Sequence, residues 1–178
     1  MNKDLLDFFK THEDTAFKFN LELRELKDLL RTKTKKVAQC VERPECFPQF
    51  SFWSSISEGD ETFPFICDSC YCYTEIAGVP VQIEVTIQVD DRGWQILLWL
   101  PEDGDFSKVC KWLEGHEIPP ARINQSDKQW IYAEYKDPDL SLAEEKVGAK
   151  FQELLEAITK GRGPKAMQAL SVASKKRQ

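Results

Sequence analysis

The sequence predicts an α+β domain in which helices cover an antiparallel sheet, and three observations lead to that fold class. Residues 81–89 alternate branched apolar and polar side chains, which is the period of two of a β-strand. Residues 94–100 resume an apolar pattern after a short turn rich in Asp and Gly, so the two runs form a hairpin. Residues 17–37 and 141–160 instead place apolar side chains at helical spacing.

The N-terminal part is expected to be helical. Residues 3–10 have apolar side chains at helical spacing and predict a short helix. Residues 17–30 are ambiguous, because their first half alternates like a strand. Interpreted as a helix, the stretch carries one apolar stripe made of Phe19, Leu23, Leu26 and Leu30. Its charged residues favour the helix, which we expect to run to Val37 and to pack on the sheet.

Four consecutive strands with short turns between them predict an antiparallel meander. We expect these strands at residues 50–56, 63–76, 81–89 and 94–100. Residues 40–48 contain two prolines and are expected to form a connection, and residues 57–61 have the composition of a turn.

A helix, a loop and a fifth strand are expected next. Residues 106–114 have helical spacing, with Asp105 as the N-cap and Gly115 as the natural end. Residues 118–128 are expected to be a loop, and residues 129–135 alternate again and predict the strand.

The long C-terminal helix, residues 141–160, is predicted to start with a capping box formed by Ser141 and Glu144. The Gly and Pro residues that follow are expected to end it, leaving residues 161–178 as a basic, mobile tail. The chain is thus predicted to form a single domain, residues 1–160. Its parts are an N-terminal helical segment at 1–40, a four- to five-stranded sheet with an inserted helix at 49–135 and the C-terminal helix at 141–160.

Composition narrows the function classes. Hydrophobic content of 42% and charged content of 30% are typical of globular proteins, and no apolar run approaches the roughly 20 residues that span a bilayer. Six cysteines without a secretory signal indicate free thiols or metal in a reducing compartment, so we expect a cytoplasmic location. Residues 42–105 hold thirteen acids against two arginines, which disfavours direct nucleic-acid binding and favours a partner with a basic surface.

The cysteines offer one candidate metal site. Cys67 and Cys70 would bind Zn²⁺ if Cys40 and Cys46 completed a tetrahedral set. Five residues separate Cys40 from Cys46, however, which is more than the usual two to four. A strand at 63–76 would also point Cys67 and Cys70 to opposite faces. We therefore favour buried structural thiols and expect no cofactor.

Glu134 and Lys136, at the end of the fifth predicted strand, offer a candidate nuclease-like site. An acid and a lysine two positions apart can hold Mg²⁺ and orient water, with Glu84 or Asp105 as the second carboxylate. Such pairs are common among solvated charges, and helix capping explains Asp105 better. We favour the interpretation without catalysis.

The tryptophans suggest a binding surface. Leu97 and Trp99 lie on the hairpin face opposite Trp94, so the strand 94–100 is apolar on both sides. This pattern is typical of a strand covered on both faces, or of one that keeps an aromatic patch for a partner. Our candidate binding residues are Trp99, Leu97 and Glu84.

The sequence contains no convincing catalytic set, and the predicted function is that of a non-enzymatic, acidic, cytosolic protein-binding module. It would act as a chaperone, adaptor or inhibitor through its sheet face or its N-terminal helix, and a homodimer stays open. The order of elements is similar to that of bacterial secretion-chaperone-like folds and of decayed nuclease folds, with no motif that selects either family. The alternatives are a Mg²⁺-dependent phosphodiesterase, a small zinc-stabilised module and a DNA-mimicking inhibitor. No membrane partner is expected.

Overall fold

The computed structural model describes residues 10–43, 47, 49–55, 66–89 and 93–175, with side chains for all of these except residues 16 and 162–175. Its elements in chain order are α2 (Glu13–Cys40), β1 (Ser51–Ser54), β2 (Cys67–Ile76), β3 (Val79–Gln88), β4 (Trp94–Trp99), α4 (Phe106–Gly115), β5 (Arg122–Asn124), β6 (Gln129–Tyr135) and α5 (Glu144–Lys175). The fold is α+β, as predicted.

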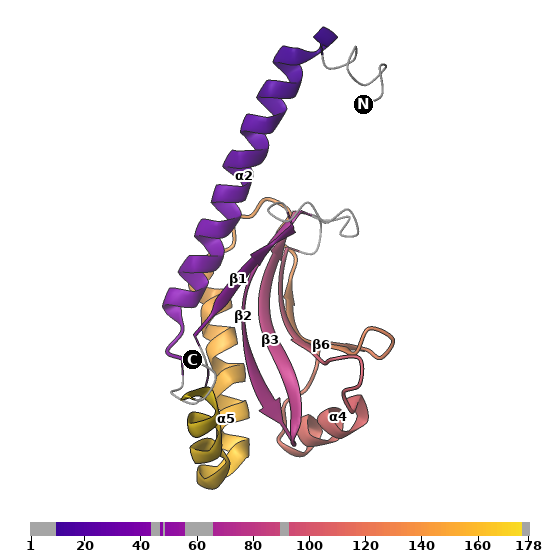
Figure 1. Ribbon diagram of the computed structural model, residues 1–178, viewed down its shortest axis with the longest axis vertical. Helices are drawn as coiled ribbons and strands as arrows, with labels where there is room; N and C mark the ends of the chain where they lie inside the picture. The colour runs from indigo at the N-terminus through magenta and orange to yellow at the C-terminus, as the bar shows by residue number, and fades with distance from the viewer. Residues whose placement is uncertain (1–9, 44–46, 48, 56–65, 90–92, 176–178) are drawn as a thin grey trace.

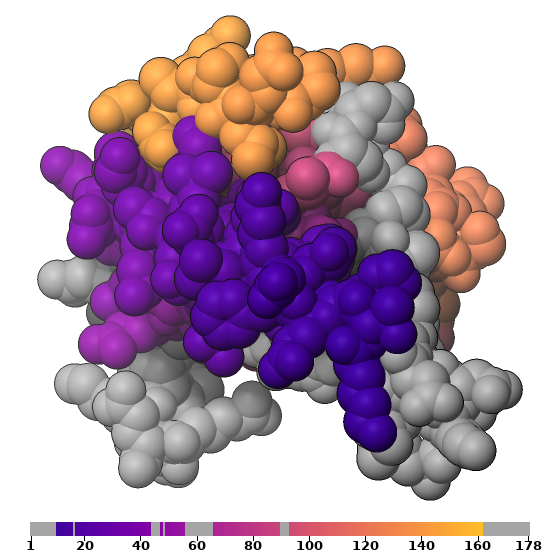
Figure 2. Space-filling view, turned by 90° about the horizontal axis from the view of Figure 1, so that it is seen from above, coloured from indigo at the N-terminus to yellow at the C-terminus, as the bar shows by residue number. Residues whose placement is uncertain are grey.

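The six strands form one curved antiparallel sheet in the order β1-β2-β3-β4-β6-β5 (Figure 1). Helices α2 and α5 lie together on one side of this sheet, and α4 lies at the end away from the projecting end of α2. The view from above in Figure 2 shows the projecting helix α2 next to α5. We call the face beneath α2 and α5 the covered face, and the opposite one the open face.

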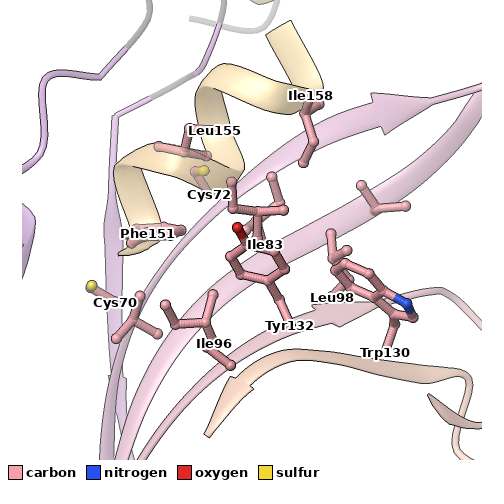
Figure 3. Packing of buried hydrophobic residues seen from close by; sticks show 14 of the residues in the cluster. Cys70, Cys72, Ile83, Ile96, Leu98, Trp130, Tyr132, Phe151, Leu155 and Ile158 are labelled. Carbon is pink, nitrogen blue, oxygen red and sulfur yellow. The ribbon is translucent and has the colours of Figure 1, made fainter. Parts of the chain in front are cut away.

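The covered face carries the hydrophobic core. Side chains alternate along each strand, so every second residue of β2, β3 and β4 points toward the helices. Figure 3 shows members of this core cluster: Cys70, Cys72, Ile83, Ile96, Leu98, Trp130 and Tyr132 from the sheet, and Phe151, Leu155 and Ile158 from α5. Helix α2 adds the buried residues Leu30 and Val37 to the same cluster. Burial of this apolar surface is the main stabilising contribution.

Polar contacts fix α2 on β2. Asp68 is fully buried on β2, and its carboxylate lies 2.9 Å from the Arg31 guanidinium and accepts a hydrogen bond from the Thr34 hydroxyl. Burial raises the Asp68 pKa, and the Thr34 hydrogen bond and the Arg31 charge lower it in part. A buried carboxylate is tolerated when it is paired and hydrogen-bonded, and this one therefore ties α2 to the sheet.

Two further contacts join α2 to α5. The Lys33 ammonium lies 3.0 Å from the Glu144 carboxylate at the first residue of α5. At Gly148 of α5, an added Cβ atom would lie 2.9 Å from the Cβ atom of Cys40. The two helices therefore approach so closely that a side chain larger than glycine would force them apart.

The N-terminal half of α2 extends beyond the sheet (Figure 1). Phe17, Phe19 and Leu21 are 72%, 63% and 48% exposed. Leu30, further along the helix, is fully buried, so the apolar surface of α2 continues past the point at which the sheet covers it.

Most predicted elements are present. The meander of four antiparallel strands, the hairpin, the helix after Asp105 and the strand 129–135 are confirmed, and the predicted helix 17–37 runs from Glu13 to Cys40. The Asp105 side chain accepts a hydrogen bond of 2.9 Å from the Lys108 amide, as an N-cap does. The predicted helix 3–10 and turn 57–61 lie outside the described residues, apart from Lys10.

Three predictions are wrong. The predicted loop 118–128 contains β5, which makes the sheet six-stranded rather than four- to five-stranded. The predicted capping box does not form, because the Ser141 hydroxyl donates to Asp137 and Glu144 pairs with Lys33. Helix α5 does not end at Lys160: it continues to Lys175, so most of the predicted tail 161–178 is helical.

Candidate binding cleft on the open face

A cleft of about 610 Å³ lies on the open face. Residues from β1 to β6 and from the turn between β5 and β6 line it: Trp53, Cys67, Tyr71, Gln82, Glu84, Thr86, Gln88, Gln95, Leu97, Trp99, Arg122, Asp127 and Gln129. We call this feature the open-face cleft. Its lining combines aromatic rings, amide groups and charges, which is the mixture found in ligand sites rather than in a dry core.

Strand register places these side chains in rows across the sheet. Tyr71, Glu84 and Leu97 are direct partners on β2, β3 and β4, and the row continues through Ile131 to Arg122. Partners in such a row have Cβ atoms roughly 5 Å apart. The Glu84 carboxyl group is therefore flanked by an aromatic ring on one side and an aliphatic side chain on the other.

The neighbouring rows are mainly polar. Gln82 pairs with Trp99, and Trp99 pairs with Gln129. On the other side of Glu84, Ser69 pairs with Thr86, and the row continues through Gln95 and Glu134. These groups bring both donors and acceptors to the floor of the open-face cleft.

Glu84 lies at the centre of the cleft. Its carboxylate accepts a 3.0 Å hydrogen bond from the Gln82 amide. The Glu84 side chain is half-buried, with protein atoms around most of it and an exposed part where the cleft opens. The loss of water around the carboxyl group raises the pKa of Glu84. The Ser69 hydroxyl, the Gln82 amide and the Trp99 indole act in the opposite direction and lower this pKa.

Three buried polar atoms on the open face make no hydrogen bond of normal geometry within the described chain, although two of them lie near enough to Glu84 to lower its pKa. They are the Ser69 hydroxyl, the Trp99 indole nitrogen and the Gln88 amide oxygen. Buried polar groups are normally satisfied by protein, water or ligand. Ser69 and Trp99 belong to the rows on either side of Glu84, whereas Gln88 lies four residues further along β3.

Charged groups at the β5–β6 side of the cleft are already engaged. The Arg122 guanidinium lies 3.3 Å from the Glu134 carboxylate, which also accepts a 2.7 Å hydrogen bond from Gln95. Asp127 accepts a hydrogen bond from Asn124 in the turn. Arg122 therefore serves Glu134 and makes no ion pair with Glu84.

The three predicted binding residues meet in this cleft. Trp99, Leu97 and Glu84 all line it, Leu97 as the register partner of Glu84 and Trp99 one row away. Sequence reasoning missed Tyr71, Trp53 and the glutamines of the floor. The signal for the glutamines was present, because the polar positions of the strand 81–89 define the open face.

The predicted nuclease residues do not converge. Glu134 lies on β6 and pairs with Arg122, whereas Glu84 lies two strands away on β3. Asp105 caps α4, and Lys136 is an exposed residue beyond the end of β6. Across the described residues, no group of three or more His, Cys, Asp or Glu side chains is placed to hold a metal ion.

The predicted zinc ligands also lie apart. Cys40 is exposed on α2, Cys67 lines the open-face cleft, and Cys70 is buried on the covered face. Cys46 lies outside the described residues. Burial raises the pKa of the Cys67 and Cys70 thiols, which keeps both in the neutral thiol form.

Comparison of the chain with models of known protein families, with curated proteins and with solved structures returned no match. Within the part of the chain that the structure describes, no helix combines the length and the apolar character needed to cross a bilayer.

Proposed function

We propose that this chain is a non-enzymatic module that binds another protein, and that the open-face cleft is its recognition site. The observation that carries the proposal is the asymmetry of the sheet. Two helices bury the covered face, whereas the open face keeps a cleft of about 610 Å³ with unpaired buried polar atoms on its floor.

The lining of the cleft suits a segment of polypeptide. The amide side chains on its floor both donate and accept hydrogen bonds, as the backbone of an extended peptide requires. Trp53, Tyr71 and Trp99 provide rings against which apolar side chains can pack, and aromatic residues dominate the energetics of protein interfaces. A volume of this size exceeds that of one side chain and accommodates several consecutive groups.

The charge of the chain favours a basic partner. The full sequence carries a net charge of −6, and the acids are concentrated in residues 42–105, which include β1 to β4. A field of one sign accelerates association with an oppositely charged surface and weakens with added salt. We therefore expect the association rate to fall steeply as ionic strength rises.

Helix α2 offers a second surface for the same function. Phe17, Phe19 and Leu21 are exposed on its projecting half, and exposed apolar side chains that gather on one element favour contact with a partner. Binding through this surface would not depend on the residues of the open-face cleft. The two surfaces can therefore be distinguished by substitution.

The experiment is a selection of peptides from a random library against the full chain, followed by mapping of the selected peptides. The five tryptophans give five indole N–H signals in an NMR spectrum, and Trp53 and Trp99 line the cleft. We expect selected peptides to shift these two signals. We expect Trp99→Ala to weaken binding at least tenfold, because truncation of an interface hot spot costs about 2 kcal/mol or more.

The matched control is Trp112→Ala, which truncates another partly buried tryptophan on α4, outside the open-face cleft. It should leave peptide affinity unchanged. If peptide binding is lost with Phe17→Ala and kept with Trp99→Ala, the recognition site is on α2 and not in the open-face cleft. Peptides that are insensitive to both substitutions would overturn the proposal that either surface binds them.

A further inference from the structure

Glu84 differs from every other shielded acid in the described chain. Five acidic residues there are buried or partly buried. Three have a cation as partner: Asp68 with Arg31 at 2.9 Å, Glu144 with Lys33 at 3.0 Å and Glu134 with Arg122 at 3.3 Å. Asp137 instead accepts three hydrogen bonds from the turn that follows it. Among the described residues, no cationic side chain pairs with Glu84.

Three donors around Glu84 offset part of the cost of burying its negative charge. The Gln82 amide donates a 3.0 Å hydrogen bond to its carboxylate. The Ser69 hydroxyl and the Trp99 indole N–H make no such bond of normal geometry, but they lie close enough to lower the pKa of Glu84. Neither of those two groups has a hydrogen-bond partner elsewhere among the described residues. The site is therefore organised around a carboxylate whose counter-charge the described part of the chain does not provide.

Aromatic rings flank the same carboxyl group. Tyr71 is the direct register partner of Glu84, and Trp99 lies one row away on β4. The face of an aromatic ring attracts cations, and the chain uses this contact elsewhere, with the Lys150 ammonium 4.7 Å from the Tyr132 ring centroid. A carboxylate beside two aromatic rings is the combination that binds an ammonium or guanidinium group.

We propose that the open-face cleft receives a Lys or Arg side chain of the partner protein, with its cationic group beside the Glu84 carboxylate and between the Tyr71 and Trp99 rings. This inference rests on the proposed function and adds the chemical class that the cleft selects. It also agrees with the acidic character of residues 42–105, which attracts basic segments from a distance.

The test is a titration of the full chain with four small probes, followed through the five indole N–H signals. The probes are N-acetyl-arginine amide, N-acetyl-lysine amide, the uncharged isostere N-acetyl-norleucine amide, and spermidine. Trp94, Trp112 and Trp130 lie outside the cleft and serve as internal references. We expect the arginine or lysine amide to shift the Trp53 and Trp99 signals, and norleucine amide to leave them in place.

Glu84→Gln keeps the shape of the side chain and removes its charge. We expect this substitution to weaken binding of the basic amide at least tenfold, because loss of one partner of a shielded charge pair is costly. Glu114→Gln, at an exposed position on α4, is the matched control and should have no effect. Equal shifts with norleucine amide, or unchanged affinity in Glu84→Gln, would overturn the inference.

The remaining outcomes separate this inference from the proposed function. If spermidine binds and neither basic amide does, the ligand of the cleft is a free polyamine and not a protein side chain, and the inference is overturned. Library peptides that bind the cleft but contain no Lys or Arg would overturn the inference and leave the proposed function standing. Basic amides that bind at Glu84, together with library peptides that never touch the cleft, would overturn only the proposed function.

Discussion

Gly161 of α5 lies so close to Trp112 of α4 that a Cβ atom added to the glycine would come within 2.7 Å of the indole ring. The same atom would lie 2.6 Å from the ring of His116, which stacks on Trp112 with the ring centroids 3.9 Å apart. Real Cβ atoms essentially never approach other heavy atoms so closely. Helix α5 therefore reaches the end of α4 only because residue 161 has no side chain.

Gly161→Ala should destabilise the fold. The added methyl group must push the Trp112–His116 stack away from α5, and overpacking of this kind costs about 1–3 kcal/mol. Urea denaturation followed by tryptophan fluorescence would show a lower midpoint with an unchanged slope.

The control for this substitution is Gly115→Ala, at the last residue of α4. A Cβ atom at this position meets nothing within 4 Å, so alanine adds no clash and restricts the unfolded chain. Its stability should be equal to that of the parent chain or higher by up to about 1 kcal/mol. A Gly161→Ala protein as stable as Gly115→Ala would contradict the close approach of α4 and α5.

The same glycine shows why the end of α5 was predicted wrongly from the sequence. A Gly-Arg-Gly-Pro run is a typical helix stop, but glycine and proline weaken a helix by a finite amount and do not forbid it. The requirement for Gly161 comes from a contact with α4, which is distant in sequence. The spacing of residues within one segment does not show contacts between helices that are distant in sequence. Strand β5 was missed for a similar reason, because its three residues are mostly exposed and pair with β6 rather than bury a face.

The elements that were predicted correctly have a regular spacing of apolar residues within their own sequence. The alternation in residues 81–89 fixes which face of β3 is apolar, and the same alternation placed Glu84 on the other face. The position of Leu97 and Trp99 beside Glu84 followed from the hairpin. Tyr71 was missed although its register is local: β2 and β3 form a tight hairpin with Ile76 paired to Val79, and counting back from that turn pairs Tyr71 with Glu84. Trp53 was missed because a longer connection separates β1 from β2, and a single sequence does not fix the register of such a pair.

Asp68→Ala should be strongly destabilising. It removes the acceptor of the Thr34 hydroxyl and leaves the Arg31 guanidinium, which is largely shielded, without its partner. Breaking a buried ion pair costs about 3–5 kcal/mol. Chemical denaturation would measure the loss, and hydrogen exchange should show faster opening of α2.

Lys18→Ala on the same helix is the comparison for Asp68→Ala. The Lys18–Glu22 pair is 4.0 Å long, and both of its side chains are mostly exposed, so its removal should change stability by less than about 0.5 kcal/mol. Equal effects of the two substitutions would mean that Asp68 does not attach α2 to the sheet.

Asp137→Ala should loosen the turn that leads into α5. The buried Asp137 carboxylate accepts hydrogen bonds from the Ser141 amide at 2.9 Å, the Ser141 hydroxyl at 3.1 Å and the Leu142 amide at 2.7 Å. Hydrogen bonds to a charged group contribute about 1.5–3 kcal/mol, so a loss in this range or above is expected in thermal unfolding. Asp139→Ala, at an exposed position in the same turn, should be close to neutral.

Glu84→Gln should make the fold more stable at neutral pH and change how stability depends on pH. Burial raises the pKa of Glu84 above its ordinary value, so the folded chain retains this proton at pH values where the unfolded chain has released it. The parent chain therefore loses stability as pH rises through the folded-state pKa of Glu84, and this loss is absent below the unfolded-state value. Asp68 titrates in both proteins, so the difference between them isolates Glu84.

Urea denaturation of both proteins between pH 4 and pH 8 tests this expectation. The advantage of Glu84→Gln should be largest at the alkaline end and should vanish toward pH 4. A difference that is constant with pH would mean that Glu84 carries its charge in the fold at no cost, as a carboxylate with a counter-ion does. In the presence of a bound basic ligand, the advantage of Glu84→Gln should shrink or reverse, because the ligand stabilises the charged carboxylate that only the parent chain has.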